Sequence, residues 1–373
     1  MHAGASGQPP TATAGPTSFA LRPFRGLALS AQRVGDPASA RAFARPYRDV
    51  AARLERWEAQ GHVVRDREAA LYLHEYTVGA LTVRGLVGAL DVSRAGAAER
   101  VVLPHEGVHQ DQAADLAARM GEMELNPAPI LLVHRGPGAV RDLIGRIMTD
   151  SPWQEYVDRA ERHNRVWAVR DGSLLTELAE HLASSRPLIA DGHHRYAAYV
   201  ALHEQRPGTA ADLGLAMLVD QDDTPLHLGA IHRTISRTDL DDLARAVGPA
   251  GTLTATTEAS ALAALSPTTL AVTDGAAWAR LDLGALTERA AVQVLHEDVL
   301  PRLQGPHVVG YHHSVDDALE RVARGQQLAV LMPAPDFDLV DRIVSSHRLL
   351  PEKATSFQPK PSLGVLMRSL LDG

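Results

Sequence analysis

The chain has 373 residues, of which 45% are hydrophobic, 22% are charged and 4% are aromatic, so it is long enough for a large core and about two domains. Its net charge of -8 and its few aromatic residues argue against a protein that coats nucleic acid or stacks bases along a single strand. The absence of cysteine excludes disulfides, thiolate zinc sites and a cysteine nucleophile, and no apolar run is long enough to span a bilayer.

The first part of the chain alternates strand and helix patterns. Residues 1–17 have neither an apolar core nor a basic start, which predicts a disordered tail on a cytoplasmic protein. A short apolar segment, "FALRPFRGLALS", is followed by apolar residues at helical spacing over 38–60. Two alternating strands, 70–78 and 81–92, flank Gly79-Ala80 and predict a hairpin. A third strand, "RVVLPHE", ends at Pro104, and a helix follows over 110–123.

The rest of the chain predicts a mixed fold. An apolar strand at 187–190 runs into Asp191, and a helix begins near Tyr196. Because strand patterns restart after Pro207 and Gly208, we expect one domain at 18–207 and a second, smaller α/β domain at 208–373 that closes a cleft. Such alternation indicates α/β or α+β packing. Further strand patterns cover 128–136, 165–172, 213–220, 226–235, 269–274 and 328–333, and further helix patterns cover 174–185, 285–300, 314–325 and 336–347.

One segment, "VVLPHEGVHQ", has the H-E-x-x-H spacing of zinc proteases, formed by His105, Glu106 and His109. In such proteases both histidines lie on one face of an established helix. Here Pro104 breaks any helix arriving from upstream, and Gly107 weakens a helical turn by about 1 kcal/mol relative to Ala. No later segment has a motif that indicates a third zinc ligand. A zinc-dependent hydrolase is therefore disfavoured, and no zinc is expected.

A second segment, "IADGHHRY", predicts a phosphate site. A strand that turns through Gly192 into a helix leaves free backbone N–H groups at the positive end of the helix dipole. Arg195 can add a bidentate contact, Asp191 can hold Mg²⁺ or a substrate hydroxyl, and His193 and His194 can donate to phosphoryl oxygens. In the alternative interpretation Asp191 only caps the helix and Arg195 pairs with a surface carboxylate.

Two further clusters carry charge that could reach the same cleft. His232 and Arg233 lie in an apolar strand, "AIHRTI", although an arginine in a strand more often extends to solvent. Lys353 and Lys360 lie between prolines in "LPEKATSFQPKPSLGVL", where a stiffened loop could clamp an anion or simply wrap the core.

The order of these segments resembles a known family. "PFRGL", "PY.DV", "LPHE", "IADGHHRY", "HR" and "P.K.T.F.PK" look like the family catalogued as domain of unknown function number ten-fifteen, over nearly the whole chain after the tail. Its Asp-Gly-His-His-Arg segment is similar to the phosphate-binding turn of the ParB and sulfiredoxin-like fold. Members of that fold include free-serine kinases, a CTP-binding partition protein and sulfiredoxin, whose own chemistry is excluded here because it needs a cysteine.

The resemblance implies a ParB/sulfiredoxin-like mixed sheet and assigns Asp191, Gly192, His193, His194 and Arg195 to the phosphate site. By the role of a glutamate in the kinases, it implies that Glu106 is the general base. The chain departs from the family pattern in two places, since Arg48 interrupts the Pro-Tyr-Asp-Val run and Val108 replaces a usual Thr.

Together these patterns predict a phosphotransferase that moves a phosphoryl group from a nucleotide or pyrophosphate to the hydroxyl of a small metabolite. The family resemblance implies free L-serine as that metabolite. Catalysis by positioning and charge neutralisation would suffice. The alternative is a nucleotide sensor without turnover. No nucleic-acid or membrane partner is expected, and the oligomeric state is left open. The assigned roles are catalytic for His105, Glu106 and Asp191, Mg²⁺ binding for Asp191, and phosphate binding for Gly192, His193, His194, Arg195, His232, Arg233, Lys353 and Lys360.

Overall fold

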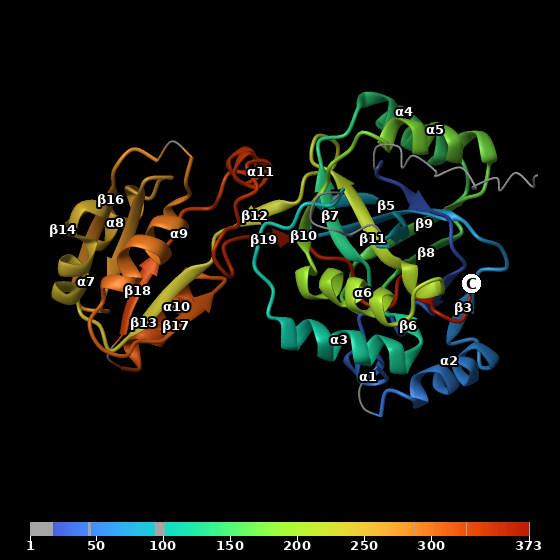
Figure 1. The fold of residues 1–373 in the computed structure, drawn as a ribbon, viewed down its shortest axis with the longest axis horizontal. Helices are drawn as coiled ribbons and strands as arrows, with labels where there is room; N and C mark the ends of the chain where they lie inside the picture. The colour runs from blue at the N-terminus through green and yellow to red at the C-terminus, as the bar shows by residue number, and fades with distance from the viewer. Residues whose placement is uncertain (1–17, 44–45, 94–100, 287, 326, 373) are drawn as a thin grey trace, which may run out of the picture.

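The computed structural model describes residues 18–43, 46–93, 101–286, 288–325 and 327–372. The predicted tail at 1–17 lies outside the described residues. Two lobes lie side by side, a larger lobe at the right of Figure 1 and a smaller lobe at the left. Both lobes contain helices and strands. Among the described residues, no helix has the length and apolarity needed to cross a membrane.

The larger lobe is built on an eight-stranded sheet. Its strands run in the order β10-β7-β11-β5-β4-β9-β8, with β1 paired to β5. The β7–β11 pair is parallel and the other pairs are antiparallel, so the sheet is mixed and the predicted α/β class is confirmed. The strands are β1 (Leu21–Arg22), β4 (Leu71–Val78), β5 (Leu81–Asp91), β7 (Ile130–His134), β8 (Gln154–Val157), β9 (His163–Val169), β10 (Leu188–Asp191) and β11 (Leu213–Asp220).

Helices cover both faces of this sheet. α3 and α6 pack against each other on one side, and α4 and α5 lie together on the other (Figure 1). Because β11 is covered on both faces, it is a nearly continuous apolar run that is buried from Gly214 onward. The helices of this lobe are α1 (Pro37–Arg41), α2 (Asp49–Ala59), α3 (Gln110–Met123), α4 (Gly138–Ile147), α5 (Gly172–Leu182), α6 (His193–Gln205) and a 3-10 turn at Ala210–Asp212.

The smaller lobe holds a six-stranded sheet in the order β14-β16-β15-β18-β13-β17, whose pairs are all antiparallel. Its strands are β13 (His232–Ser236), β14 (Gly251–Thr256), β15 (Thr269–Thr273), β16 (Trp278–Leu283), β17 (Val309–His312) and β18 (Gln327–Leu331). Its helical segments are α7 (Leu240–Val247), Gly248–Ala250, α8 (Glu258–Ala263), α9 (Ala291–Val294), Leu295–Val299, Leu300–Arg302 and α10 (Val315–Ala323).

The chain passes between the lobes twice. It leaves through β12 (His227–Gly229) and returns through α11 (Phe337–Ser345) and β19 (Ser356–Gln358), which pairs with β12. It then adds β20 to a four-stranded sheet of the larger lobe, in the order β3-β2-β20-β6. The strands of that sheet are β2 (Gly26–Leu29), β3 (Val63–Arg65), β6 (Leu125–Asn126) and β20 (Met367–Ser369).

These strand pairings show that the chain passes from the larger to the smaller lobe later than the sequence predicts. The sequence places this crossing point at 207/208, but β11 lies after that point and pairs with β5 and β7 of the larger sheet. The chain therefore crosses between residues 220 and 232, and its last described strand returns to the larger lobe. That the lobes are separate domains stays a prediction.

Several predicted elements differ in detail. The hairpin at Gly79-Ala80 is confirmed. Arg100 of the predicted strand "RVVLPHE" lies outside the described residues. The rest of that prediction is wrong, because 101–106 make only isolated bridges at Leu103 and Glu106. The predicted strand 226–235 divides into β12 and β13, which belong to different sheets. The helix expected near Tyr196 begins at His193, so the two histidines and Arg195 form its first turn.

Candidate functional site

Three segments distant in sequence meet at the amino end of α6. Leu103 bridges Leu188 of β10, and Glu106 bridges Leu350, both in parallel. The Leu350 amide donates to the His105 carbonyl at 2.7 Å. The extended segment 103–109 is therefore held between β10 and residues 350–360, which we call the 350–360 loop.

The turn between β10 and α6 needs a glycine. Gly192 has φ of +97°, in the left-handed region, and is the N-cap of α6. A Cβ at this position would lie 3.0 Å from Ile130 Cγ2. The first N–H groups of α6 have no acceptor within the helix. That this turn binds phosphate stays a prediction.

A second helix begins at the same place. His109 is the N-cap of α3, and its ring stacks on that of His194 with centroids 5.9 Å apart. The His109 amide also donates to His194 Nε2 at 3.3 Å. The amino ends of α3 and α6 therefore converge, and both helix dipoles present their positive ends there. The motif around Gly192 predicts only the α6 turn, although the predicted start of a helix at residue 110 is a signal for the second helix end.

Asp191 lies between two cations. Its Oδ2 accepts from Arg195 Nη2 at 2.5 Å and its Oδ1 accepts from Lys360 Nζ at 2.5 Å. Arg195 Nη1 also donates to the Pro129 carbonyl at 2.5 Å. The interpretation of Asp191 as a helix cap is wrong, because Gly192 occupies that position. Each oxygen of Asp191 already accepts from a cationic side chain, so the predicted Mg²⁺ binding by Asp191 does not fit this arrangement.

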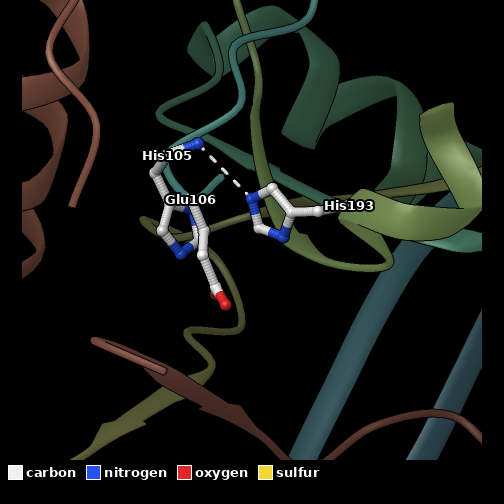
Figure 2. A group of neighbouring side chains, drawn as sticks. All are labelled: His105, Glu106 and His193. Carbon is white, nitrogen blue, oxygen red and sulfur yellow. Dashed lines mark hydrogen bonds between the residues drawn. The ribbon is translucent and has the colours of Figure 1, made fainter. Parts of the chain in front are cut away.

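His105, Glu106 and His193 form a compact group, shown in Figure 2. The His105 amide donates to His193 Nε2 at 3.4 Å, and the two rings are nearly perpendicular with centroids 4.4 Å apart. Burial lowers the pKa of His105 to about 4 and that of His193 well below its usual value, so both rings are neutral at pH 7. His105 Nε2 lies 2.6 Å from Thr355 Oγ1. Glu106 is only partly buried and faces this neutral surface.

The 350–360 loop completes the group. The Lys353 amide donates to Glu106 Oε1 at 3.0 Å, and Lys353 has a left-handed φ of +55°. Arg233 stabilises this turn because its Nη2 donates to the carbonyls of Glu352, at 3.2 Å, and Lys353, at 2.9 Å. The exposed Lys353 side chain lies near His193 and His194, and its charge lowers the pKa of both, after burial and the neighbouring histidines.

The structure does not bring every predicted residue to the turn. His232 lies in β13, where its Nδ1 accepts from the Met332 amide at 3.1 Å, and its other close groups belong to the smaller lobe. Arg233 is 1% exposed and donates to backbone carbonyls and to His296. Burial lowers the pKa of Arg233 to about 10, with Tyr311 and Glu106 opposing the shift. Arg233 is therefore a buried residue that holds the 350–360 loop and lies close to Glu106.

The zinc motif does not form as its spacing implies. His105 and Glu106 group with His193, whereas His109 stacks on His194 and lies 3.7 Å from a carboxylate oxygen of Glu352.

Comparison with known proteins gives one family and several solved structures. Residues 20–299 match the family model described as "Protein of unknown function (DUF1015)". No curated protein matches the chain in sequence. A conserved hypothetical protein from Pyrococcus furiosus is 15% identical, with a TM-score of 0.42 over 77% of this chain and 96% of its own. A free serine kinase in complex with AMP is 16% identical, with a TM-score of 0.42 over 76% and 91%. SbnI from Staphylococcus aureus, truncated at its C-terminus, is 13% identical, with a TM-score of 0.46 over 76% and 88%.

Proposed function

This chain belongs to the DUF1015 family of proteins of unknown function, and we propose that it is a phosphotransferase that moves a phosphoryl group from a nucleotide or pyrophosphate to the hydroxyl of a small metabolite. The observation that carries the proposal is the convergence of the amino ends of α3 and α6 beside Glu106. Two helix amino ends form a strong anion site, and a carboxylate next to it can accept a proton from an attacking hydroxyl.

The residues divide into three roles. The backbone N–H groups that follow Gly192 and His109 hold the phosphoryl oxygens. Lys353 and Lys360 neutralise charge from the 350–360 loop, and Arg195 fixes Asp191 in the turn. Glu106 accepts the hydroxyl proton, because it is only partly buried. His105 and His193 are buried, and their lowered pKa values make them weaker bases than an ordinary imidazole. Phosphoryl transfer needs mainly such positioning and charge neutralisation.

Free L-serine is the acceptor that we propose first. It rests on the resemblance of "IADGHHRY" to the corresponding segment of free-serine kinases. The departures at Arg48 and Val108 make a panel of acceptors necessary.

The test is to incubate the purified chain with Mg²⁺, with ATP, ADP or pyrophosphate, and with hydroxylated amino acids, and to detect phosphorylated product by mass. Glu106→Gln should abolish turnover and leave nucleotide binding within about twofold, because only the base is lost. Glu155→Gln, an exposed carboxylate on β8, is the control and should keep full activity.

Two outcomes separate the alternatives. An active Glu106→Gln enzyme would remove the base assignment. Tight nucleotide binding without product for any pair would favour the nucleotide sensor, which uses the same anion site without transfer.

A further inference from the structure

The group of His105, Glu106 and His193 has a chemistry that the phosphate site does not need. Each residue offers one donor atom, and these three atoms lie within 4.8 Å of one another. The donors come from two segments, with His105 and Glu106 on the extended segment and His193 on the first turn of α6 (Figure 2).

We propose that His105, Glu106 and His193 form a binding site for a transition-metal dication of the zinc type. Two imidazoles and one carboxylate are a common zinc ligand set. Donors at about 2.1 Å in a tetrahedral arrangement lie about 3.4 Å apart. Side-chain rotations can close the group around an ion, since no pair of donors begins more than 4.8 Å apart. His193 would give up the long hydrogen bond of 3.4 Å that its Nε2 accepts from the His105 amide. Imidazole ligands favour zinc over magnesium.

The surroundings of the group hold its side chains in place. His105 is 1% exposed, and its ring lies against the Ile189 backbone, although its Nδ1 makes no hydrogen bond of normal geometry among the described residues. Its Nε2 is fixed by Thr355, and Glu106 is fixed by the Lys353 amide. Histidine ligands of metals commonly have such a second partner, which orients the ring before the ion arrives.

One nearby charge opposes a dication. Lys353 lies close enough to His193 and His194 to act on both rings, so its ammonium group weakens metal binding. Removal of this charge should therefore raise the affinity of the site for a metal ion.

The bound metal would regulate the proposed transfer. A dication on Glu106 removes the carboxylate from its role as base, so occupancy inhibits turnover. This consequence rests on the proposed function, whereas metal binding itself does not.

The experiment titrates the purified full chain with Zn²⁺ alone, by calorimetry and by competition with a chromophoric chelator. We expect one tight equivalent. Glu106→Gln and His193→Asn should each weaken it by more than the 10–100-fold typical of lost supporting contacts. Lys353→Met should tighten it several-fold, because a repelling charge is removed. His109→Ala is the matched control, since His109 belongs to the H-E-x-x-H spacing but not to the group, and it should bind zinc like the wild type.

Two results would overturn the proposal. One is a loss of zinc affinity in His109→Ala as large as that in His193→Asn, which would indicate that the H-E-x-x-H motif binds the metal. The other is binding of several zinc ions at weak, equivalent sites that persist in Glu106→Gln and His193→Asn. Zinc would then bind nonspecifically to other histidines among the 18 of the chain. Thermal melts confirm that each variant is folded. Phosphate affinity in the same samples separates the proposals, because retained phosphate binding without a zinc site contradicts only this one.

Discussion

Single residues at the centre of the site have backbone and burial requirements that their side-chain chemistry alone does not reveal. Gly192 has a left-handed conformation, and a Cβ there would crowd Ile130. The sequence predicts that Arg195 binds phosphate, and in the structure its guanidinium also donates to Asp191 and to the Pro129 carbonyl. Such roles depend on which groups surround a residue after folding, and one sequence does not contain that information.

Gly192→Ala should lower the free energy of unfolding by about 1–2 kcal/mol, because an L-residue in this conformation brings Cβ against the backbone. It should also weaken phosphate binding by displacing the first turn of α6. Urea unfolding and phosphate calorimetry measure the two effects. Gly107→Ala is the control, since Gly107 has no positive φ and its added Cβ meets no atom within 4 Å. Equal stability of the two variants would contradict the argument.

At the scale of elements, the sequence predicted the strands and helices with strong periodicity and missed those that depend on tertiary contacts. The segment 101–106 is as apolar as a strand, yet it makes only isolated bridges because its neighbours are single residues of β10 and the 350–360 loop. The α6 turn was predicted from Asp191, Gly192 and Arg195. Its partner at the start of α3 was not, because nothing local shows that two helix ends meet.

The anchoring of the 350–360 loop by Arg233 leads to a prediction. Arg233→Met leaves the carbonyls of Glu352 and Lys353 without their donor, so the free energy of unfolding should fall by about 2–4 kcal/mol. The Lys353 amide, which holds Glu106, should exchange hydrogen at least tenfold faster. Hydrogen-exchange mass spectrometry of residues 350–355 measures this change.

Arg368→Met is the matched control for that experiment. Arg368 is also a buried arginine, is 4% exposed, and donates to the carbonyls of Ala210 and Leu213, which are not part of the 350–360 loop. It should destabilise the chain to a similar degree without altering exchange at 350–355. If both variants changed that exchange alike, Arg233 would have only a general effect on stability.

For the whole molecule, the mixed α/β class followed from the alternation of patterns, but the crossing point between lobes did not. Composition changes at 207–208 marked a surface turn, and the true partner of each strand depends on pairing across long distances. β12 and β19 pair with Gly229 opposite Ser356, so residues 230 and 355 are neighbours in space.

This neighbourhood permits a test of the lobes as domains. A chain in which a short Gly-Ser linker replaces 231–354 should fold cooperatively with reduced stability and should lose phosphate binding, because the loop with Lys353 is gone. A chain that ends at residue 207 should not fold, because it lacks β11 and β20. Thermal melts followed by circular dichroism and the dispersion of NMR chemical shifts show whether each of the two chains is folded. A folded fragment 18–207 would restore the predicted boundary.

The position of β20 between β2 and β6 has a consequence for biosynthesis. Every other strand of the larger lobe leaves the ribosome earlier, and domains tend to fold as they emerge. The 350–360 loop, which closes the site, also emerges after all of those strands except its own β19. A nascent chain can therefore form most of its main sheet while its site is still open, so a ligand would first meet a complete site only near the end of translation of this region.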